Sequence, residues 1–145
     1  MKAVIQRVLE ASVEVEGKIV GKIKEGILIY LAVMKGDTLE KANALAEKIV
    51  FYRIFPDKDH KMNLSLKDIQ GEALVISQFT LAADCRKGRR PGFELAASPE
   101  DALLLYQKFI EQVQTFGVFA ANGIFGASMR VHSINNGPVT FILEI

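Results

Sequence analysis

The chain has 145 residues, half of them hydrophobic, and its 18 Lys and Arg against 17 Asp and Glu leave a formal net charge of +1. A chain this apolar and this close to neutral can bury enough surface to offset its conformational entropy, which excludes a disordered protein. The longest apolar run, GILIYLAVM at 26–34, is far shorter than the roughly 18 residues of a membrane span. We expect one domain over residues 1–145, cytoplasmic, with no membrane partner.

Metal-binding and nucleophilic side chains are scarce in this sequence. Cys85 is the only cysteine, and His60 and His132 are the only histidines. One cysteine excludes an intramolecular disulfide and a cysteine-based zinc site, and two histidines give no support for a histidine-rich metal site. We therefore expect no metal and no cofactor.

The first third of the chain is predicted to be an antiparallel meander. Segments 3–8 and 12–16 are rich in Val and Ile, and the second alternates apolar and acidic residues with the period of a half-buried strand. Gly17 and Gly26 then mark turns into strands over 18–23 and 27–33.

Two helices follow. Asp37 is a candidate N-cap for the first, while Ser98 as N-cap, Pro99 at the first helical position and Gly117 beyond the end delimit the second. Both carry apolar residues at helical spacing, namely Ala42, Leu45, Ala46, Ile49 and Val50 in the first, and Ala102, Leu105, Tyr106, Phe109 and Val113 in the second.

Three further strands are predicted over 73–79, 127–134 and 139–145. The last two flank NNGP at 135–138, whose Asn-Gly and Gly-Pro pairs are typical of a hairpin turn. Strands grouped first and then interleaved with helices indicate an α+β fold, in which antiparallel β-sheets form a barrel-like core covered by two main helices.

A cationic segment, DCRKGRRP at 84–91, differs from the rest of the chain. Its four cations and one anion give +3, whereas the remaining 14 Lys and Arg and 16 Asp and Glu give −2. Arginine binds phosphates well, so a polyanion such as RNA is one interpretation, and a solvated surface loop is the other. Aromatic residues are not interleaved with the cations, apart from Phe93 just beyond them, so this segment alone does not predict base stacking.

A polar break closes the buried strand predicted at 73–79. Ser77, Gln78 and Thr80 bring two hydroxyls and an amide to the end of this strand, a place where functional sites are common. Neither hydroxyl has a base nearby in the sequence, so a site and a simple strand-end turn both remain open.

Seven short blocks occur in order along almost the whole chain. They are QRV at 6–8, YRIF at 52–55, KMN at 61–63, SQFTLA at 77–82, GRRPGF at 88–93, FGA at 125–127 and NNGPVT at 135–140. Together they resemble the D-aminoacyl-tRNA deacylase (D-tyrosyl-tRNA deacylase) family. The resemblance implies a homodimeric, metal-free esterase that hydrolyses the ester between a D-amino acid and the terminal ribose of tRNA, and that also removes glycine mischarged onto tRNA.

The resemblance also implies roles for individual residues. The pocket floor would comprise Ser77, Gln78, Phe79 and Thr80. Gly137 and Pro138, joined by a cis peptide bond, would form a chiral gate that enters the site of the partner subunit. Asn136 belongs to the same turn, Arg7 would support the gate and Met129 would lie nearby. The tRNA-binding residues would be Arg86, Lys87, Arg89 and Arg90.

Thr80 has two possible roles within that interpretation. It is either a covalent nucleophile or a group that positions water activated by the ribose hydroxyl of the substrate. Because no local base could activate Thr80, we expect the positioning role. The backbone N–H groups around Phe79 and Thr80 are candidate donors to the tetrahedral oxyanion.

Two positions depart from the family pattern, and two alternative functions remain. Asn136 and Ser128 stand where acidic residues are common in the family. Each replaces a charge by a neutral hydrogen-bonding group, so we expect activity to survive. The alternatives are a non-enzymatic RNA-binding module, in which the cationic segment holds RNA and the strand end is only structural, and an oligomeric small-metabolite binder with a pocket at the dimer seam.

Overall fold

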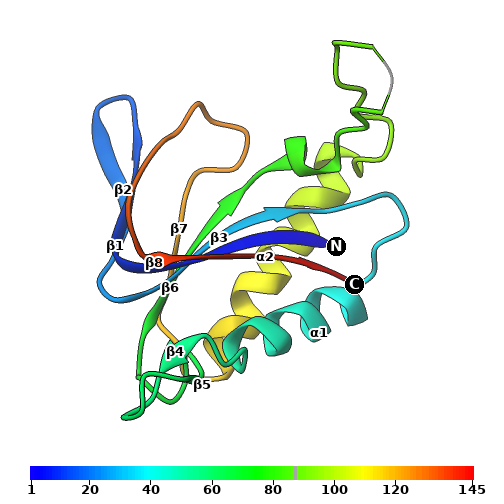
Figure 1. Cartoon of the computed structure of the whole chain (residues 1–145). Coiled ribbons are helices and arrows are strands. Elements are labelled where there is room, and N and C mark those ends of the chain that lie inside the picture. Colours follow the sequence, from blue (N-terminus) through cyan, green and yellow to red (C-terminus); the bar gives the residue numbers. More distant parts are fainter. Residues whose placement is uncertain (87) are drawn as a thin grey trace.

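The structure is a computed structural model that describes residues 1–86 and 88–145. Its elements in chain order are β1 (Lys2–Val15), β2 (Lys18–Ile23), β3 (Gly26–Ala32), α1 (Leu39–Val50), β4 (Phe55–Pro56), β5 (Met62–Leu64), β6 (Glu72–Ser77), the short 3-10 helix η1 (Phe79–Ala82), α2 (Pro99–Thr115), β7 (Ala120–Asn122) and β8 (Arg130–Glu144) (Figure 1). Over the described part of the chain, no helix is long and apolar enough to cross a membrane.

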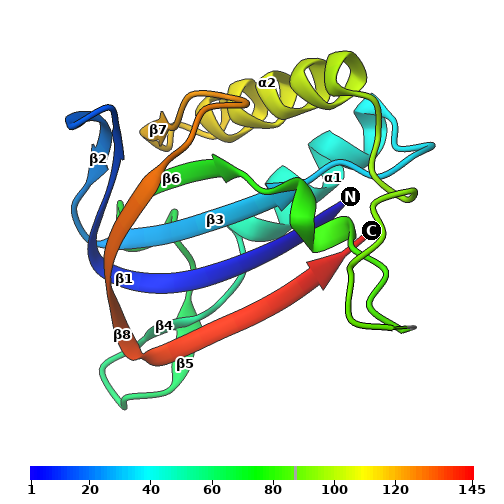
Figure 2. The ribbon, with the colours of Figure 1, turned by 90° about the horizontal axis from the view of Figure 1, so that it is seen from above.

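The main sheet is mixed and nearly closes into a barrel. Its strands run in the order β2-β1-β3-β6-β7, and β8 also pairs with β1. Strand β3 pairs with residues 2–8 of β1 and β2 with residues 11–15, whereas β8 pairs along residues 2–14. Gly21 of β2 lies so close to β7 that an added Cβ would be 2.7 Å from the carbonyl oxygen of Asn122, so the two ends of the strand order approach each other. Two helices cover one face of this sheet (Figure 2), and the expected α+β class and barrel-like core are confirmed.

The expectation of wholly antiparallel sheets is wrong for two of the five strand pairings in this sheet. Strands β2, β3 and β8 are antiparallel to β1, but β3 and β6 are parallel, as are β6 and β7. The reason is that α1 connects β3 to β6 and α2 connects β6 to β7. A helical crossover returns the chain to the end at which the previous strand began, so the next strand runs in the same direction.

The predicted hairpin turn at 135–138 is also wrong. The chain is one long strand, β8, on both sides of this segment, and both sides pair with β1: Asn135 lies opposite Val8, and Thr140 opposite Gln6. Between these pairs β1 has a single residue, Arg7, whereas β8 has residues 136–139. Because the 14-residue β1 is long enough to pair with both flanks, the extra residues leave the ladder as an excursion.

The helices match their predictions except at one cap. The five apolar positions of α1 are all buried, and Ser98 caps α2 with Pro99 as its first residue. The N-cap of α1 is Thr38 and not Asp37. The Asp37 carboxylate is occupied elsewhere, because it accepts hydrogen bonds from the N-terminal ammonium of Met1 at 2.7 Å and from the Met34 N–H at 2.6 Å.

Two apolar clusters lie on the two faces of the sheet. The larger packs strand residues against the helices, with Phe109 of α2 and Leu45 of α1 fully buried. The smaller comprises Val8, Ala11, Val13, Ile23, Leu28, Leu74 and Ile76. Strand β6 contributes to both clusters and ends at the half-buried Ser77, so its end lies where the packed interior meets the surface.

Candidate active site

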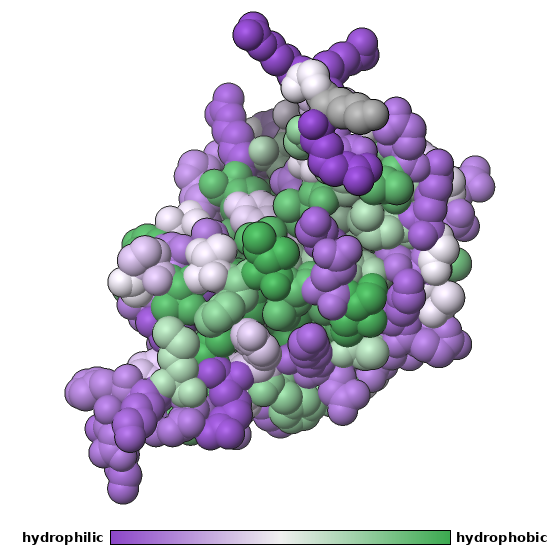
Figure 3. All heavy atoms as spheres, turned by 45° about the vertical axis from the view of Figure 1, so that its right-hand side comes forward, coloured by the Kyte–Doolittle hydropathy of each residue, from purple (hydrophilic) through white to green (hydrophobic). Residues whose placement is uncertain are grey.

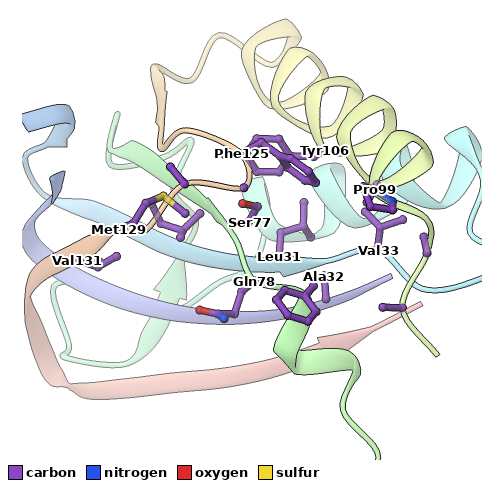
Figure 4. Close-up of a pocket in the computed structure, with 17 residues that line it drawn as sticks. Leu31, Ala32, Val33, Ser77, Gln78, Pro99, Tyr106, Phe125, Met129 and Val131 are labelled. Carbon is purple, nitrogen blue, oxygen red and sulfur yellow. The ribbon is translucent and has the colours of Figure 1, made fainter. Parts of the chain in front are cut away.

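A pocket of about 500 Å³ opens at the end of β6. It lies between the ends of β3 and β6, the start of α2 and the segment that leads into β8. Figure 4 shows Tyr106 and Phe125 together on one side, Met129 and Val131 on another, Ser77 between these groups and Gln78 below Ser77. The pocket therefore has a mostly apolar wall and a polar floor.

The described lining of this pocket holds no Asp, Glu, His, Cys, Lys or Arg side chain. Its one titratable group is Tyr106, which is buried and whose hydroxyl donates to the Val75 carbonyl at 2.8 Å. Burial raises the pKa of Tyr106 well above its ordinary value, so this phenol stays neutral. Its ring packs against Phe125 with centroids 5.8 Å apart. Tyr106 is thus a wall of the pocket, and general acid or base chemistry has no described side chain here to use.

The polar floor is built where β6 gives way to η1. The Gln78 N–H donates to the Leu31 carbonyl at 2.8 Å, which continues the pairing with β3 by one residue, and the chain then turns into η1 at Phe79. The Gln78 side-chain amide donates to the Thr80 hydroxyl oxygen at 2.6 Å. The Thr80 oxygen is thereby held as an acceptor, while its own proton remains available to another group.

Not every predicted floor residue lies in the pocket of this chain. Ser77, Gln78 and Phe79 line it, as does Met129, whereas the exposed Thr80 lies next to the lining through its bond to Gln78. The sequence did not predict that the aromatic rings of Tyr106 and Phe125 line the pocket. The sequence patterns indicate only that Tyr106 belongs to the apolar stripe of its helix and that Phe125 belongs to the FGA block.

The excursion at 136–139 forms a second, separate group of predicted site residues. The Gly137–Pro138 peptide bond is cis, as the resemblance implied, and both residues are exposed. Arg7 holds this segment, because its Nε donates to the Asn136 carbonyl at 3.0 Å. The same guanidinium donates through Nη1 to the Ile54 carbonyl at 2.7 Å.

Asn135 closes the base of the excursion. Its side-chain oxygen accepts from the Val139 N–H at 2.9 Å, and its side-chain nitrogen donates to the Thr140 hydroxyl at 3.1 Å. The Gln6 side chain donates to the same hydroxyl at 3.2 Å. These bonds replace the ladder bonds that the excursion interrupts, so the protruding segment is fixed at both ends. None of its residues lines the pocket of its own chain.

The cationic segment forms a loop closed by pairing between Asp84 and Gly92. Arg86 is bound to Asp84 at 2.8 and 2.6 Å, and this guanidinium holds the pKa of the carboxyl well below its usual range. Arg89 and Arg90 are exposed, and Lys87 lies outside the described residues. The loop projects from the body (Figure 1), and Figure 3 shows its hydrophilic side chains extending above a face with exposed apolar surface.

The structure gives Phe93, just beyond the cations, an aromatic partner that the sequence did not predict. Phe93 follows the Asp84–Gly92 closure, and its ring lies 5.0 Å from the ring of Phe79, centroid to centroid, at an interplanar angle of 56°. Phe79 in turn lines the pocket. The pocket, an aromatic pair and the cationic loop therefore follow one another along the surface.

Possible metal ligands do not gather in the described part of the chain. Across residues 1–86 and 88–145, no group of three or more His, Cys, Asp and Glu side chains is placed to hold a metal ion.

Proteins similar to this chain share its length and its fold. A relative from Geotalea daltonii (strain DSM 22248 / JCM 15807 / FRC-32), named D-aminoacyl-tRNA deacylase, is 60% identical over 144 residues, which are 99% of this chain and 96% of the relative. A relative of the same name from Pelobacter propionicus (strain DSM 2379 / NBRC 103807 / OttBd1) is 59% identical over 144 residues and covers 99% of both chains.

Two solved structures are similar to this chain over nearly its whole length. One described as "c-Myc DNA Unwinding Element Binding Protein" superposes with a TM-score of 0.94 at 40% identity, covering 100% of this chain and 99% of its own. A probable eukaryotic D-amino acid tRNA deacylase has a TM-score of 0.85 at 18% identity over 99% of this chain and 98% of its own, which shows the shared fold. The family model described as D-Tyr-tRNA(Tyr) deacylase matches residues 4–144. The chain belongs to the D-Tyr-tRNA(Tyr) deacylase family.

Proposed function

We propose that this chain is an esterase that hydrolyses the bond between a D-amino acid and the terminal ribose of tRNA, releasing both. The observation that carries the proposal is end-to-end similarity to proteins named D-aminoacyl-tRNA deacylase. The pocket is consistent with this activity, because its apolar wall suits an amino-acid side chain and its floor of Ser77 and Gln78 offers hydrogen bonds to a polar ester. Such a substrate places the enzyme in the cytoplasm, where tRNA is used.

The pocket chemistry favours a reaction assisted by the substrate. Water attacks the ester carbonyl carbon, and the neighbouring ribose hydroxyl takes a proton from this water as it passes its own proton to the ester oxygen. The tetrahedral intermediate then collapses with cleavage of the bond to that protonated ribose oxygen. Thr80 positions the water through the hydroxyl that Gln78 orients. The N–H groups of Phe79 and Thr80 stabilise the oxyanion; both begin η1, so neither has a partner within that helix.

Selection for D-amino acids is assigned to the excursion of a second subunit. Gly137 and Pro138 are exposed and lie outside their own pocket, yet Arg7 and Asn135 hold the segment in one place. A rigid protrusion of this kind suits insertion into a neighbouring site, where its carbonyls bind the substrate ammonium and leave no room for an L side chain. Glycine has no side chain to exclude, so glycine mischarged onto tRNA is also hydrolysed and the enzyme acts in proofreading.

A homodimer with the site at the subunit interface follows from this assignment. Ile134 and Ile142 of β8, which flank the excursion, are 50% and 68% exposed. Large apolar side chains on the strand that carries the protruding segment are what an interface around it would cover.

The cationic loop is assigned to the phosphates of the tRNA acceptor end. Arg86, Arg89 and Arg90 are exposed on one projecting segment, where Asp84 balances the charge of Arg86, and Lys87 belongs to the same run. Binding that depends on these charges weakens steeply as the salt concentration rises. A non-enzymatic nucleic-acid-binding module would use the same loop. The observation that favours this alternative is the solved structure described as a DNA unwinding element binding protein. A nucleic-acid-binding module, however, does not account for a pocket with a polar floor.

The decisive experiment compares hydrolysis of D- and L-aminoacyl-tRNA by the wild type and by Gly137→Ala, with sedimentation at the same concentration. Gly137 has a φ of +136°, and an added Cβ would lie 2.7 Å from Val139 Cγ2 and 3.0 Å from Arg7 Nη2, so the substitution distorts the excursion. We expect the wild type to be a dimer that cleaves the D substrate and spares the L substrate, and Gly137→Ala to lose most activity. Gly17→Ala, also at a positive φ (+79°) but with no atom within 4 Å of the added Cβ, is the control.

Equal cleavage of both enantiomers by the wild type would contradict the chiral gate. Salt-sensitive tRNA binding without any turnover would instead favour the nucleic-acid-binding module. A monomer that cleaves the D substrate at full rate would rule out the assembled site.

A further inference from the structure

We infer that Phe79 and Phe93 form a stacking platform for an unpaired nucleobase of the tRNA 3′ end, the one that precedes the nucleotide carrying the ester. This inference rests on the proposed function and adds a subsite outside the pocket. The two side chains are 58% and 36% exposed, although their rings are in contact with centroids 5.0 Å apart. Two phenylalanines held together at the surface leave ring faces free for a further ring.

The platform is held by the backbone on both of its sides. Phe79 begins η1, directly after the Gln78 N–H has bonded to β3. Beyond Phe93, the Leu95 carbonyl accepts from the Lys35 N–H at 2.9 Å and the Ala97 N–H donates to the Val33 carbonyl at 3.1 Å. The chain next to each ring is therefore fixed to the end of β3, so a base would not have to order a mobile loop when it stacks.

The position of the platform identifies its occupant. Phe79 lines the pocket, while Phe93 follows the closure of the cationic loop at Gly92. A single strand whose terminal ribose lies at the pocket would pass over the platform before it reaches the loop. Arg89 and Arg90 are exposed in this loop, whereas the charge of Arg86 is balanced by Asp84. Cations beside an aromatic surface match a phosphate beside a base, which favours nucleic acid over an uncharged apolar partner.

The test compares two substrates and three variants. One substrate is D-aminoacyl-tRNA, and the other is D-aminoacyl-adenosine, which lacks every nucleotide before the terminal one. The variants are Phe93→Ala, Phe93→Tyr, which retains an aromatic ring, and Phe119→Ala. Phe119 is the matched control, because it is 60% exposed and its carbonyl bonds to Ala73 near the start of β6, away from the pocket end.

We expect Phe93→Ala to raise KM for D-aminoacyl-tRNA about tenfold more than KM for D-aminoacyl-adenosine, as loss of one stacked base predicts. Phe93→Tyr restores the wild-type ratio, and Phe119→Ala does not change it. Equal effects of Phe93→Ala on both substrates would overturn the platform, since Phe93 would then act by shaping the pocket. A shift of Phe93→Ala from dimer to monomer in sedimentation would overturn it too, because a second copy of the chain would be the occupant.

A second measurement separates this inference from the proposed function. Binding of a CCA trinucleotide by fluorescence anisotropy requires no hydrolysis. If the wild type cleaves neither substrate, the proposed function fails. The platform is then supported if Phe93→Ala weakens trinucleotide binding about tenfold and Phe119→Ala does not. Unchanged binding by Phe93→Ala would overturn the platform whatever the hydrolysis shows.

Discussion

The guanidinium of Arg7 donates from Nε to the backbone carbonyl of Asn136 at 3.0 Å, although the two residues are 129 positions apart. Arg7 is the single β1 residue opposite the four-residue excursion of β8, because the pairs on either side of it are Gln6 with Thr140 and Val8 with Asn135. Its second bond, to the Ile54 carbonyl at 2.7 Å, ties the excursion to the chain just before β4. One side chain thus fixes a protruding segment to the body of the protein.

We predict that Arg7→Lys lowers kcat/KM for D-aminoacyl-tRNA at least tenfold. The planar guanidinium bonds to two carbonyls at once from a fixed fork, whereas an ammonium on a flexible stem does not reproduce this geometry. Steady-state kinetics and thermal unfolding measure the effect, and we expect the unfolding temperature to change by only a few degrees. Arg130→Lys is the control, because the Arg130 side chain is 81% exposed and contacts Glu14 at 3.4 Å. Wild-type kinetics for Arg7→Lys would contradict the positioning role.

The Asn135 side chain supports a second prediction. Asn135→Ala removes the acceptor for the Val139 N–H and the donor to the Thr140 hydroxyl, and Val139 is buried, so its N–H loses a partner. An unpaired buried donor costs about 1–3 kcal/mol, and we expect the free energy of unfolding to fall by that order. The D-over-L preference should fall as well, because the base of the excursion is no longer closed.

Asn135→Asp provides the matched comparison. Its carboxylate still accepts from Val139, and the Thr140 hydroxyl can rotate to donate to it. We expect this variant to recover most of the stability and of the D-over-L preference, as measured by urea unfolding and paired deacylation assays. If the aspartate variant behaves like alanine, the role of the hydrogen bonds is excluded.

Local patterns predicted most elements of the fold, and long-range pairing decided the rest. The Ser98–Pro99 start of α2 and the apolar stripe of α1 depend only on residues close together in the sequence. Both features can therefore be predicted from the local sequence. The parallel pairing of β6 depends on where a helix returns the chain. The NNGP segment has the composition of a hairpin turn, but its flanks pair with β1, which lies more than 100 residues away. Nothing local distinguishes these two outcomes.

The candidate site was predictable where its residues adjoin in sequence. Ser77, Gln78 and Phe79 lie together in the pocket because they adjoin at one strand end. Tyr106 was missed because a helix stripe looks the same whether a ring faces a solid core or a pocket. The contact of Phe93 with Phe79 joins two segments 14 positions apart, and the composition of the cationic loop alone gave no sign of it.

Tyr106 supports a third prediction, which distinguishes a wall from a catalytic acid. Tyr106→Phe removes a hydroxyl that donates to the Val75 carbonyl, which also accepts from the Gly123 N–H at 3.2 Å and so stays paired. We expect the free energy of unfolding to fall by about 1 kcal/mol. Because burial raises the pKa of this phenol, it does not titrate in the working range, and the shape of the pH–rate profile should stay the same. A lost limb of that profile would show that Tyr106 exchanges a proton with the substrate.

The last prediction concerns pH and the segment between β4 and β5. The Asp57 carboxylate accepts from the Asn63 side chain at 2.5 Å and from the N–H groups of Lys61 at 3.0 Å and Asp59 at 2.8 Å. These hydrogen bonds, that of Asn63 foremost, lower the pKa of Asp57 from the ordinary 3.8. A pKa lowered by folding contributes stability that is present above the ordinary value and is lost as the pH falls through the lowered value. We therefore expect Asp57→Asn to be less stable than the wild type near pH 7 and the difference to shrink below about pH 4.

Urea unfolding at pH 7, 5 and 3 measures this difference directly. Asp59→Asn is the control, since the structure gives the Asp59 carboxylate no hydrogen-bond partner among the described residues. A difference in unfolding free energy between wild type and Asp57→Asn that stays constant down to pH 3 would contradict the prediction. It would show that the hydrogen bonds from Asn63 and Lys61 do not favour the charged form of Asp57. The same segment adjoins Ile54, whose carbonyl holds Arg7, so loss of the Asp57 bonds should also lower deacylation more at pH 7 than Asp59→Asn does.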